Sequence, residues 1–320
     1  LLLSSFGFAI DFLFLAYAPT ILLLFVGRVI SGVMGASFAT AAAYIADVSE
    51  PEKRAQNFGM VGAAFGLGFI IGPAIGGVLG EVGIRIPFLA AAGLSAINWV
   101  YGMFILPESL SLENRRAFDI KRANPFGVFK QLSKHKVILG LIVSMIFVYL
   151  ASHAVQSTWA FYTKLKFDWT MAEIGYSLSF VGVLTVAVQG GLIRWLIPKI
   201  GQKKAAYWGI IFYFIGLVFF GFALSGWMMY AAMVVYCLGG IAGPALQGIM
   251  SNQLPSSEQG ELQGANTSMM SATAIVGPIL MTHVFSYFSG DSAPIHIPGA
   301  AMYLAAIFTL ISLFLCWRTL

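Results

Sequence analysis

The segment from Pro51 to Pro73 reads PEKRAQNFGMVGAAFGLGFIIGP, and the segment from Pro255 to Pro278 reads PSSEQGELQGANTSMMSATAIVGP. In each, a polar loop with a proline leads into an apolar run that ends in Gly-Pro. A shift of 205 residues carries Gly72-Pro73 onto Gly277-Pro278, and a shift of 204 carries Pro51 onto Pro255. Parallel repeats in a membrane chain are typical of transporters built from two similar helical bundles.

Composition places the chain in the membrane. Of its 320 residues, 59% are hydrophobic and only 10% are charged, against about 25% charged in soluble domains. Mean hydropathy is +0.85. The net charge of +5 is small and concentrated in loops, so it does not indicate nucleic-acid binding. Cys237 and Cys316 lie inside apolar runs and indicate packing rather than a disulfide framework. The chain opens in an apolar segment without the basic region of a cleavable signal peptide.

Apolar runs of membrane-spanning length recur along the whole chain, so the predicted fold is an all-α polytopic membrane protein. The predicted spans are 1–18, 20–46, 58–80, 87–106, 137–162, 173–197, 205–225, 227–250, 264–288 and 299–317. Loops near 47–57, 107–136 and 198–204 carry most of the lysines and arginines. The positive-inside rule therefore places these loops, and the C-terminus, in the cytoplasm. Loop 251–263 has no basic residue, yet alternation assigns it to the same side.

The charged segment 107–136 is predicted to link two halves. Residues 1–106 would form four helices of an N-terminal bundle, and residues 137–320 a C-terminal bundle of six. The repeat carries residue 1 to about Ala205, so we expect the first two helices of a twelve-helix protein to precede residue 1. The alternative is a natural ten-span protein.

Asp11 and Arg28 are charged residues at membrane depth. A charge there costs roughly 2.5–3.5 kcal/mol on insertion scales and is usually paired or functional. Burial favours the neutral form of a carboxyl group, so Asp11 could exchange a proton. The alternative for Asp11 is pairing with a basic group, including one before residue 1. The alternative for Arg28, which has glycines around it in GRVISGVMGA, is a clamp on backbone carbonyls of a neighbouring helix.

The run GLGFIIGPAIGG predicts a smooth helix face at which another helix can approach and move. The proline removes one helix hydrogen bond and loosens the helix there. A static packing face is the alternative. The residues of this helix face, called the seam below, are Gly68, Gly72, Pro73, Gly76 and Gly77.

Five uncharged polar or titratable residues at membrane depth are predicted to contact substrate. Each could instead be hydrogen-bonded within the helix packing, which is the commoner role for such residues. They are His153, Gln156, Gln189, Gln247 and Asn98. Tyr149, His153 and Gln156 share one helical face. The neighbouring Trp159, Phe161 and Tyr162 are predicted to form an interfacial aromatic belt.

The sequence shows no metal-ligand cluster, nucleophile elbow or Walker loop, so an enzyme is not predicted. The glycine-rich runs lie inside apolar helices and cannot cradle a nucleotide phosphate.

These segments resemble the major facilitator superfamily, in its twelve-span drug:proton antiporter branch, and specifically the tetracycline efflux pumps. GRVISGVMGA resembles the fourth-helix motif, whose arginine is implicated in proton coupling, which corresponds to Arg28. GLGFIIGPAIGG resembles the fifth-helix antiporter motif. Asp11 matches an important aspartate of the pumps. The resemblance implies proton-coupled efflux of tetracycline-like drugs by alternating access, no cofactor except a divalent cation carried with the substrate, and a monomer in the bacterial inner membrane.

The chain also departs from the pumps. Their essential aspartate after PKIGQKK has no counterpart here, because Tyr213 stands near the matching place. The sixth-helix histidine of some pumps corresponds to Thr185. The alternatives to an exporter are a facilitator-superfamily importer of a metabolite and a transport-inactive membrane scaffold.

Overall fold

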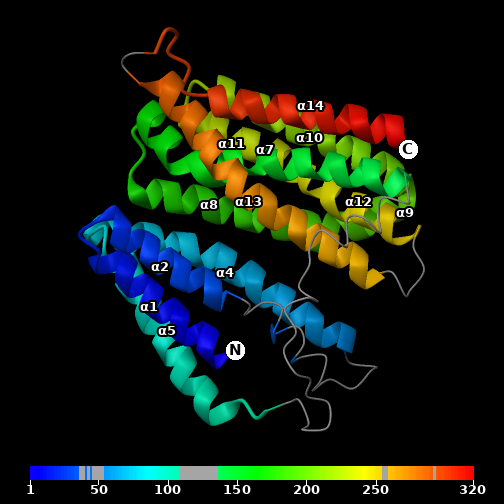
Figure 1. Ribbon diagram of the computed structural model, residues 1–320. Coiled ribbons are helices and arrows are strands. Elements are labelled where there is room, and N and C mark those ends of the chain that lie inside the picture. Colours follow the sequence, from blue (N-terminus) through cyan, green and yellow to red (C-terminus); the bar gives the residue numbers. More distant parts are fainter. Residues whose placement is uncertain (36–39, 42–43, 45–53, 109–135, 254–258, 291–292) are drawn as a thin grey trace. The chain divides into compact units, whose positions relative to one another are not determined.

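The computed structural model describes residues 1–35, 40–41, 44, 54–108, 136–253, 259–290 and 293–320, and these form helices joined by short turns (Figure 1). Within these ranges, seven helices are long and apolar enough to cross a membrane, and three shorter apolar helices accompany them. Each of the ten predicted spans overlaps one of these helices, which confirms the all-α membrane fold. Most of the predicted linker 107–136, and loop 47–57 up to residue 53, lie outside the described residues.

Helix boundaries follow local sequence signals. Thr20 caps α2 by accepting a hydrogen bond on Oγ1 from the Leu23 amide at 3.3 Å. Thr170 and Glu173 form a reciprocal capping box at the start of α8: the Thr170 amide donates to Glu173 Oε2, and the Glu173 amide donates to Thr170 Oγ1. Because these contacts satisfy the free amides of a first turn, both helices begin where the sequence has a threonine.

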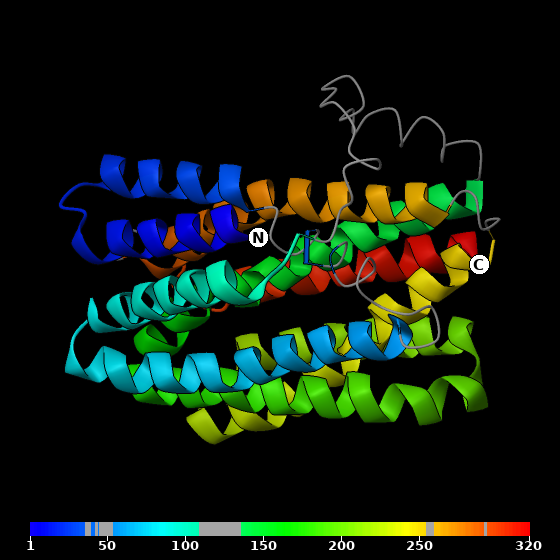
Figure 2. The same ribbon diagram turned by 90° about the horizontal axis from the view of Figure 1, so that it is seen from below.

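Two compact units are present, Leu1–Phe118 with Thr170–Ser179, and Asp119–Trp169 with Phe180–Leu320. The predicted boundary at 107–136 stays a prediction. In the first unit α1 packs against both α2 and α5, and α4 packs against α5 (Figure 2). Its helices are α1 (Leu2–Tyr17), α2 (Ile21–Met34), α4 (Arg54–Val82), α5 (Ile86–Ile105) and the first part of α8 (Met171–Val186).

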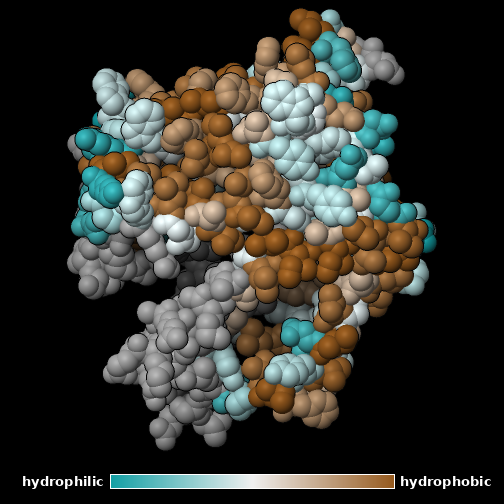
Figure 3. All heavy atoms as spheres, turned by 180° about the vertical axis from the view of Figure 1, so that it is seen from behind, coloured by the Kyte–Doolittle hydropathy of each residue, from teal (hydrophilic) through white to brown (hydrophobic). Residues whose placement is uncertain are grey.

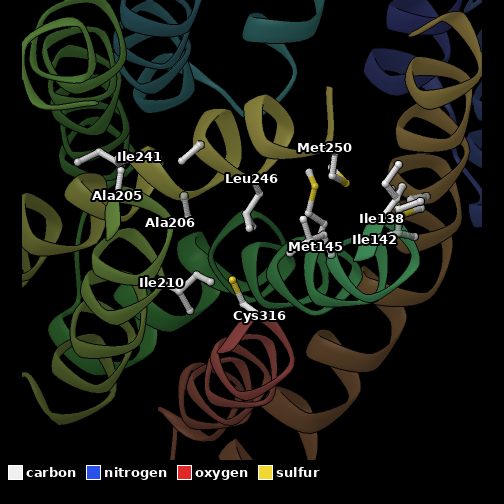
Figure 4. Close-up of a cluster of buried hydrophobic side chains, with 14 of the residues drawn as sticks. Ile138, Ile142, Met145, Ala205, Ala206, Ile210, Ile241, Leu246, Met250 and Cys316 are labelled. Carbon is white, nitrogen blue, oxygen red and sulfur yellow. The ribbon is translucent and has the colours of Figure 1, made fainter. Parts of the chain in front are cut away.

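The second unit is built around α7, which packs against α13 and α14, and around α10, which packs against α11, α12 and α14. Besides the end of α8, it contains α7 (Lys136–Phe167), η3 (Ala187–Leu192), α9 (Ile193–Ile200), α10 (Gln202–Phe222), α11 (Gly226–Leu238), η4 (Gly239–Ile241), α12 (Ala242–Ser251), α13 (Gln259–Ser289) and α14 (Ala300–Thr319). A buried apolar cluster joins these helices, and Figure 4 shows Ile142, Ile210, Leu246 and Cys316 converging within it.

Glycines let the helices of the second unit approach closely. A Cβ atom added to Gly209 would lie 2.9 Å from the Ala242 Cα, and one added to Gly216 would lie 2.6 Å from the Tyr236 Cα. Both distances are too short for any side chain. Backbone contact of this kind is how helices associate tightly in lipid, where apolar burial gives no net driving force between them.

Buried hydroxyl groups in the second unit are hydrogen-bonded across helices. Ser144 Oγ donates to the Ser312 carbonyl at 2.9 Å, and Tyr162 Oη donates to the Phe220 carbonyl at 2.6 Å. Of the predicted interfacial belt, Trp159 and Tyr162 are buried and only Phe161 is exposed. The belt prediction was therefore wrong for two residues, because α7 is a central helix of its unit rather than a peripheral one.

Both prolines of the repeat lie inside long helices, Pro73 in α4 and Pro278 in α13. Each removes one backbone hydrogen bond, so each helix has an internal weak point.

Much of the exposed surface of these helices is apolar, as Figure 3 shows by the extent of hydrophobic side chains. Ile21, Phe104 and Ile279 are 85%, 81% and 68% exposed. A surface of this kind is suited to hydrocarbon, since lipid tails replace the water that a soluble protein would meet.

Candidate functional site

Asp11 on α1 and Arg28 on α2 form an ion pair inside the first unit. Arg28 Nε donates to Asp11 Oδ1 at 3.1 Å, and Arg28 Nη2 donates to Asp11 Oδ2. The Asp11 side chain is 3% exposed, whereas the Arg28 side chain is 51% exposed. The structure thus brings together the two residues that the sequence predicts for proton coupling.

Local packing explains how the two helices come close enough for this pair. A Cβ atom on Gly27 would lie 2.8 Å from the Phe14 Cβ and 3.3 Å from Asp11 Oδ1. A side chain at position 27 would therefore push α2 away from the carboxylate. The glycine immediately before Arg28 is what allows the guanidinium to reach across to α1.

The chemistry of the pair follows from its unequal burial. A guanidinium and a carboxylate joined by two hydrogen bonds form one of the stronger ion pairs found in proteins. A buried carboxylate that loses its partner is costly, so removing either residue leaves the other in an unfavourable environment.

The predicted face of α7 carries a short hydrogen-bond chain. Gln156 Nε2 donates to Ser152 Oγ at 3.3 Å, and Ser152 Oγ donates to the Tyr149 carbonyl at 2.7 Å. His153 lies against α13, where a Cβ atom on Gly277 would overlap its imidazole ring. His153 therefore packs on the backbone immediately before Pro278, the weak point of that helix.

Gln189 and Gln247 belong to two spans with irregular backbone. Gln189 lies in the π-helical turn η3, and α12, which carries Gln247, follows the 3₁₀ turn η4. The two turns are in contact, and Gln189 Nε2 lies 3.4 Å from the position of a Cβ atom on Gly240. Turns of both kinds are frequent at functional sites and hinges within helices.

Asn98 occupies a different environment from these residues. Its Nδ2 donates to Ser5 Oγ at 3.1 Å and so joins α5 to α1 in the first unit. Tyr213 packs its ring against Tyr236 with centroids 4.8 Å apart.

The five seam residues differ in their surroundings. Cβ atoms added to Gly68, Gly72 or Gly76 would meet nothing within 4 Å among the described residues. Gly77 is in close contact, because its Cβ would lie 2.7 Å from the Met171 carbonyl oxygen and 3.0 Å from the Gly175 Cα. All of these residues belong to the first unit, where the start of α8 packs on α4.

Sequence reasoning missed the partners on the α8 side of this contact. The Ala172 amide donates to Glu81 Oε1 at 2.9 Å, and Ser179 Oγ donates to the Ile70 carbonyl at 2.7 Å. The sequence signal for this helix start was the Thr-x-x-Glu capping box formed by Thr170 and Glu173. A second missed residue is Asn266, which is 5% exposed and whose amide has no hydrogen-bond partner in the described part of the chain.

No group of three or more metal-binding side chains occurs among the residues that the structure describes.

Comparison with known proteins identifies the family. The family model for the Major Facilitator Superfamily matches residues 1–241 and 192–320. The chain belongs to the Major Facilitator Superfamily. It is 34% identical to the class C tetracycline resistance protein of Escherichia coli over 96% of this chain and 78% of that protein. It is also 34% identical to the class B protein of Escherichia coli, over 90% of this chain and 71% of that protein.

Solved structures support the same fold. A mutant of the nucleoside transporter NupG matches with a TM-score of 0.77 over 99% of this chain and 82% of that one, at 14% identity. The family and its relatives place this chain among multi-pass membrane proteins of secondary transport, and not among enzymes. The resemblance to the tetracycline pumps predicted from the sequence is confirmed at this level.

Proposed function

We propose that this protein is a proton-coupled exporter of amphipathic drug-like molecules, similar to tetracycline. The observation that carries the proposal is the Asp11–Arg28 ion pair, in which the carboxylate is almost completely buried and the guanidinium is half exposed. The relatives named for tetracycline resistance supply the substrate class.

The ion pair suggests how protons and substrate are coupled. A proton from the aqueous side binds Asp11, neutralises its carboxylate and releases Arg28. When Asp11 loses the proton to the other side, the pair forms again. The two bundles alternate between states that expose the site to one side of the membrane at a time. A ligand drives such an exchange only if it binds the two states with different affinity.

Recognition is assigned to the polar residues of the helices. His153, Gln156, Gln189 and Gln247 offer donors and acceptors of the second bundle, and Asn98 does so in the first. If tetracycline is the substrate, it is carried as a complex with a divalent cation, which makes the cation cargo rather than a resident cofactor. The protein would act as a monomer in a bacterial inner membrane with its C-terminus in the cytoplasm.

Reconstitution tests the proposal directly. Proteoliposomes containing the purified chain are given a pH gradient, and tetracycline uptake into the lumen is measured together with lumenal pH. We expect drug to move against its gradient only when protons move in the opposite direction. Co-transport of drug and protons in the same direction would support the importer alternative, and no movement under either gradient would support the scaffold alternative.

His153→Ala is expected to change substrate preference more than coupling. The imidazole is a polar group on α7 beside the Gly277-Pro278 segment, and its removal leaves Asp11 and Arg28 intact. The measurement is the ratio of transport rates for several tetracycline analogues, which should change by at least about fivefold, roughly the effect of one hydrogen bond. A uniform loss across all analogues, with coupling also lost, would contradict this role.

Tyr213→Phe is expected to leave proton coupling intact. A tyrosine hydroxyl stays protonated at neutral pH and is a poor proton carrier. The ring contact with Tyr236 remains but the hydrogen bond between the two buried hydroxyls is lost, so folded yield is measured beside coupling. Proton movement per drug molecule is measured in the proteoliposome assay. Loss of coupling in Tyr213→Phe would place the proton path in the second bundle.

A further inference from the structure

Four helix ends, those of α9, α10, α12 and α14, meet at one end of the second unit. Lys203 Nζ, at the start of α10, donates to the Leu320 carbonyl at the end of α14. α9 ends at Ile200, and Gly201, with φ of 81°, makes the turn into α10. Asn252 Nδ2, just after α12, donates to Gln202 Oε1 at 3.1 Å. These contacts fix the ends of α9, α10 and α14 as one local surface.

Four exposed cations lie on this surface, and they are called the basic end cluster: Lys199, Lys203, Lys204 and Arg318. The sequence segments that form it, 192–209 and 312–320, contain no aspartate or glutamate. Among the described residues, none of the four cations has a carboxylate partner. The two segments that carry these cations therefore contain positive charge without a carboxylate of their own.

Exposed tryptophans flank the cluster on the side toward the helix bodies. Trp195, Trp208 and Trp317 are 58%, 53% and 69% exposed. At 1.5 Å per residue, they lie within about 9 Å of the helix ends. Lys199 Nζ stands 3.8 Å from the centroid of the Trp195 ring, a cation–π contact. Tryptophan just inside the helix ends with lysine at the ends is the arrangement found at a membrane–water interface.

At the opposite end of the second unit, Lys164 and Lys166 are hydrogen-bonded to neighbouring groups of the protein. Lys164 Nζ bonds Asp168 Oδ1 at 2.8 Å, and this hydrogen bond lowers the pKa of that carboxyl group. Lys166 Nζ donates to Tyr162 Oη and to the Gly221 carbonyl, each at 2.9 Å. Lys164 is thus paired with a carboxylate, whereas none of the four cations of the basic end cluster has such a partner among the described residues.

We propose that the basic end cluster binds the phosphate of an anionic phospholipid headgroup, while the neighbouring aromatic side chains contact its glycerol and upper acyl chains. Lysines near a membrane surface attract anionic lipid. The aromatic side chains favour a lipid over a free anion: the Trp208 and Phe212 rings lie side by side with centroids 6.1 Å apart, and the Phe314 and Trp317 rings with centroids 6.5 Å apart. An occupant that meets both the cations and these rings must be amphipathic. The site does not depend on which substrate is transported.

Native mass spectrometry of the purified chain tests the site. The chain is exchanged into mild detergent containing phosphatidylcholine and phosphatidylglycerol, and retained lipid is counted. We expect phosphatidylglycerol to be retained in preference, and to raise the midpoint of thermal unfolding. The triple variant Lys199→Gln/Lys203→Gln/Lys204→Gln should lose the preference by roughly fivefold for each lysine removed. The matched control is Lys164→Gln, which removes one lysine at the opposite end and should keep the preference.

A second variant distinguishes loss of the lipid site from misfolding of the triple variant. Lys204→Gln/Arg318→Gln leaves both the Lys203–Leu320 bond and the Lys199–Trp195 contact in place, and it should still lower the preference by at least about tenfold. Equal retention of the two lipids by the unaltered chain would overturn the proposal, as would full preference in the double variant. Displacement of the lipid by millimolar inorganic phosphate would also overturn it, because the site would then bind a free anion.

Discussion

Asp11→Asn is expected to abolish drug transport driven by a pH gradient, with a fall of at least about a hundredfold in the coupled rate. Asparagine has nearly the same shape and can still accept a hydrogen bond from Arg28, but it cannot bind or release a proton. Expression and folding should be largely kept, because the amide replaces the carboxylate with little change of shape and keeps a hydrogen bond to Arg28. The measurement is drug accumulation in proteoliposomes with an imposed pH gradient, beside drug exchange without one.

Two further substitutions separate coupling from structure. Asp11→Glu keeps a titratable group and should retain part of the coupled rate. Arg28→Lys keeps the charge but loses the paired geometry that holds both carboxylate oxygens, so it should change the pH dependence of transport more than the folded yield. Wild-type coupling in Asp11→Asn would give the ion pair a structural role only.

The membrane-spanning helices could be predicted from the sequence because each depends on a local property. A run of about 20 apolar residues must be helical in lipid to satisfy its backbone, whatever it packs against. The repeat of Gly72-Pro73 and Gly277-Pro278 is equally local, and both prolines lie inside long helices. Family membership follows from such motifs, and the comparisons confirm it.

The pairing of Asp11 with Arg28 could not be predicted in this way. Each residue was recognised alone, as a charge that is costly at membrane depth. Whether Asp11 finds its partner 17 residues along the chain, or on another helix, depends on how α1 and α2 rotate about their axes. That rotation is set by packing contacts such as Phe14 against Gly27, which no sequence period reveals.

Glycine patterns carry a similar ambiguity. Spacing of four residues marks one face of a helix, but it does not show what meets that face. Gly72 and Gly76 fit the pattern best, yet Cβ atoms there would meet nothing within 4 Å in the described residues. Gly209 and Gly216 lie in a helix without a run of glycines spaced four apart. Cβ atoms at these two positions would nevertheless overlap the backbone of a neighbouring helix.

This contrast gives a prediction for folding. Gly216→Leu is expected to destabilise the protein severely, because the added Cβ would lie 2.6 Å from the Tyr236 Cα and 2.8 Å from its backbone nitrogen. Neither atom can move without separating α10 from α11. Overpacking typically costs about 1–3 kcal/mol, and more where backbone must shift. Folded yield and the midpoint of thermal unfolding in detergent measure the effect.

Gly72→Leu is the matched control for Gly216→Leu, and it also tests the proposed seam. The same side chain enters open space in the described conformation, so folding and drug binding should stay within about twofold of the wild type, as for surface substitutions. If α4 must close on a neighbouring helix during transport, the leucine obstructs that closed state, and the transport rate should fall at least about tenfold while binding is kept. Parallel loss of binding and transport would indicate misfolding. A wild-type transport rate would show that this face of α4 stays open throughout the cycle, and that the seam is limited to the contact of Gly77 with Gly175.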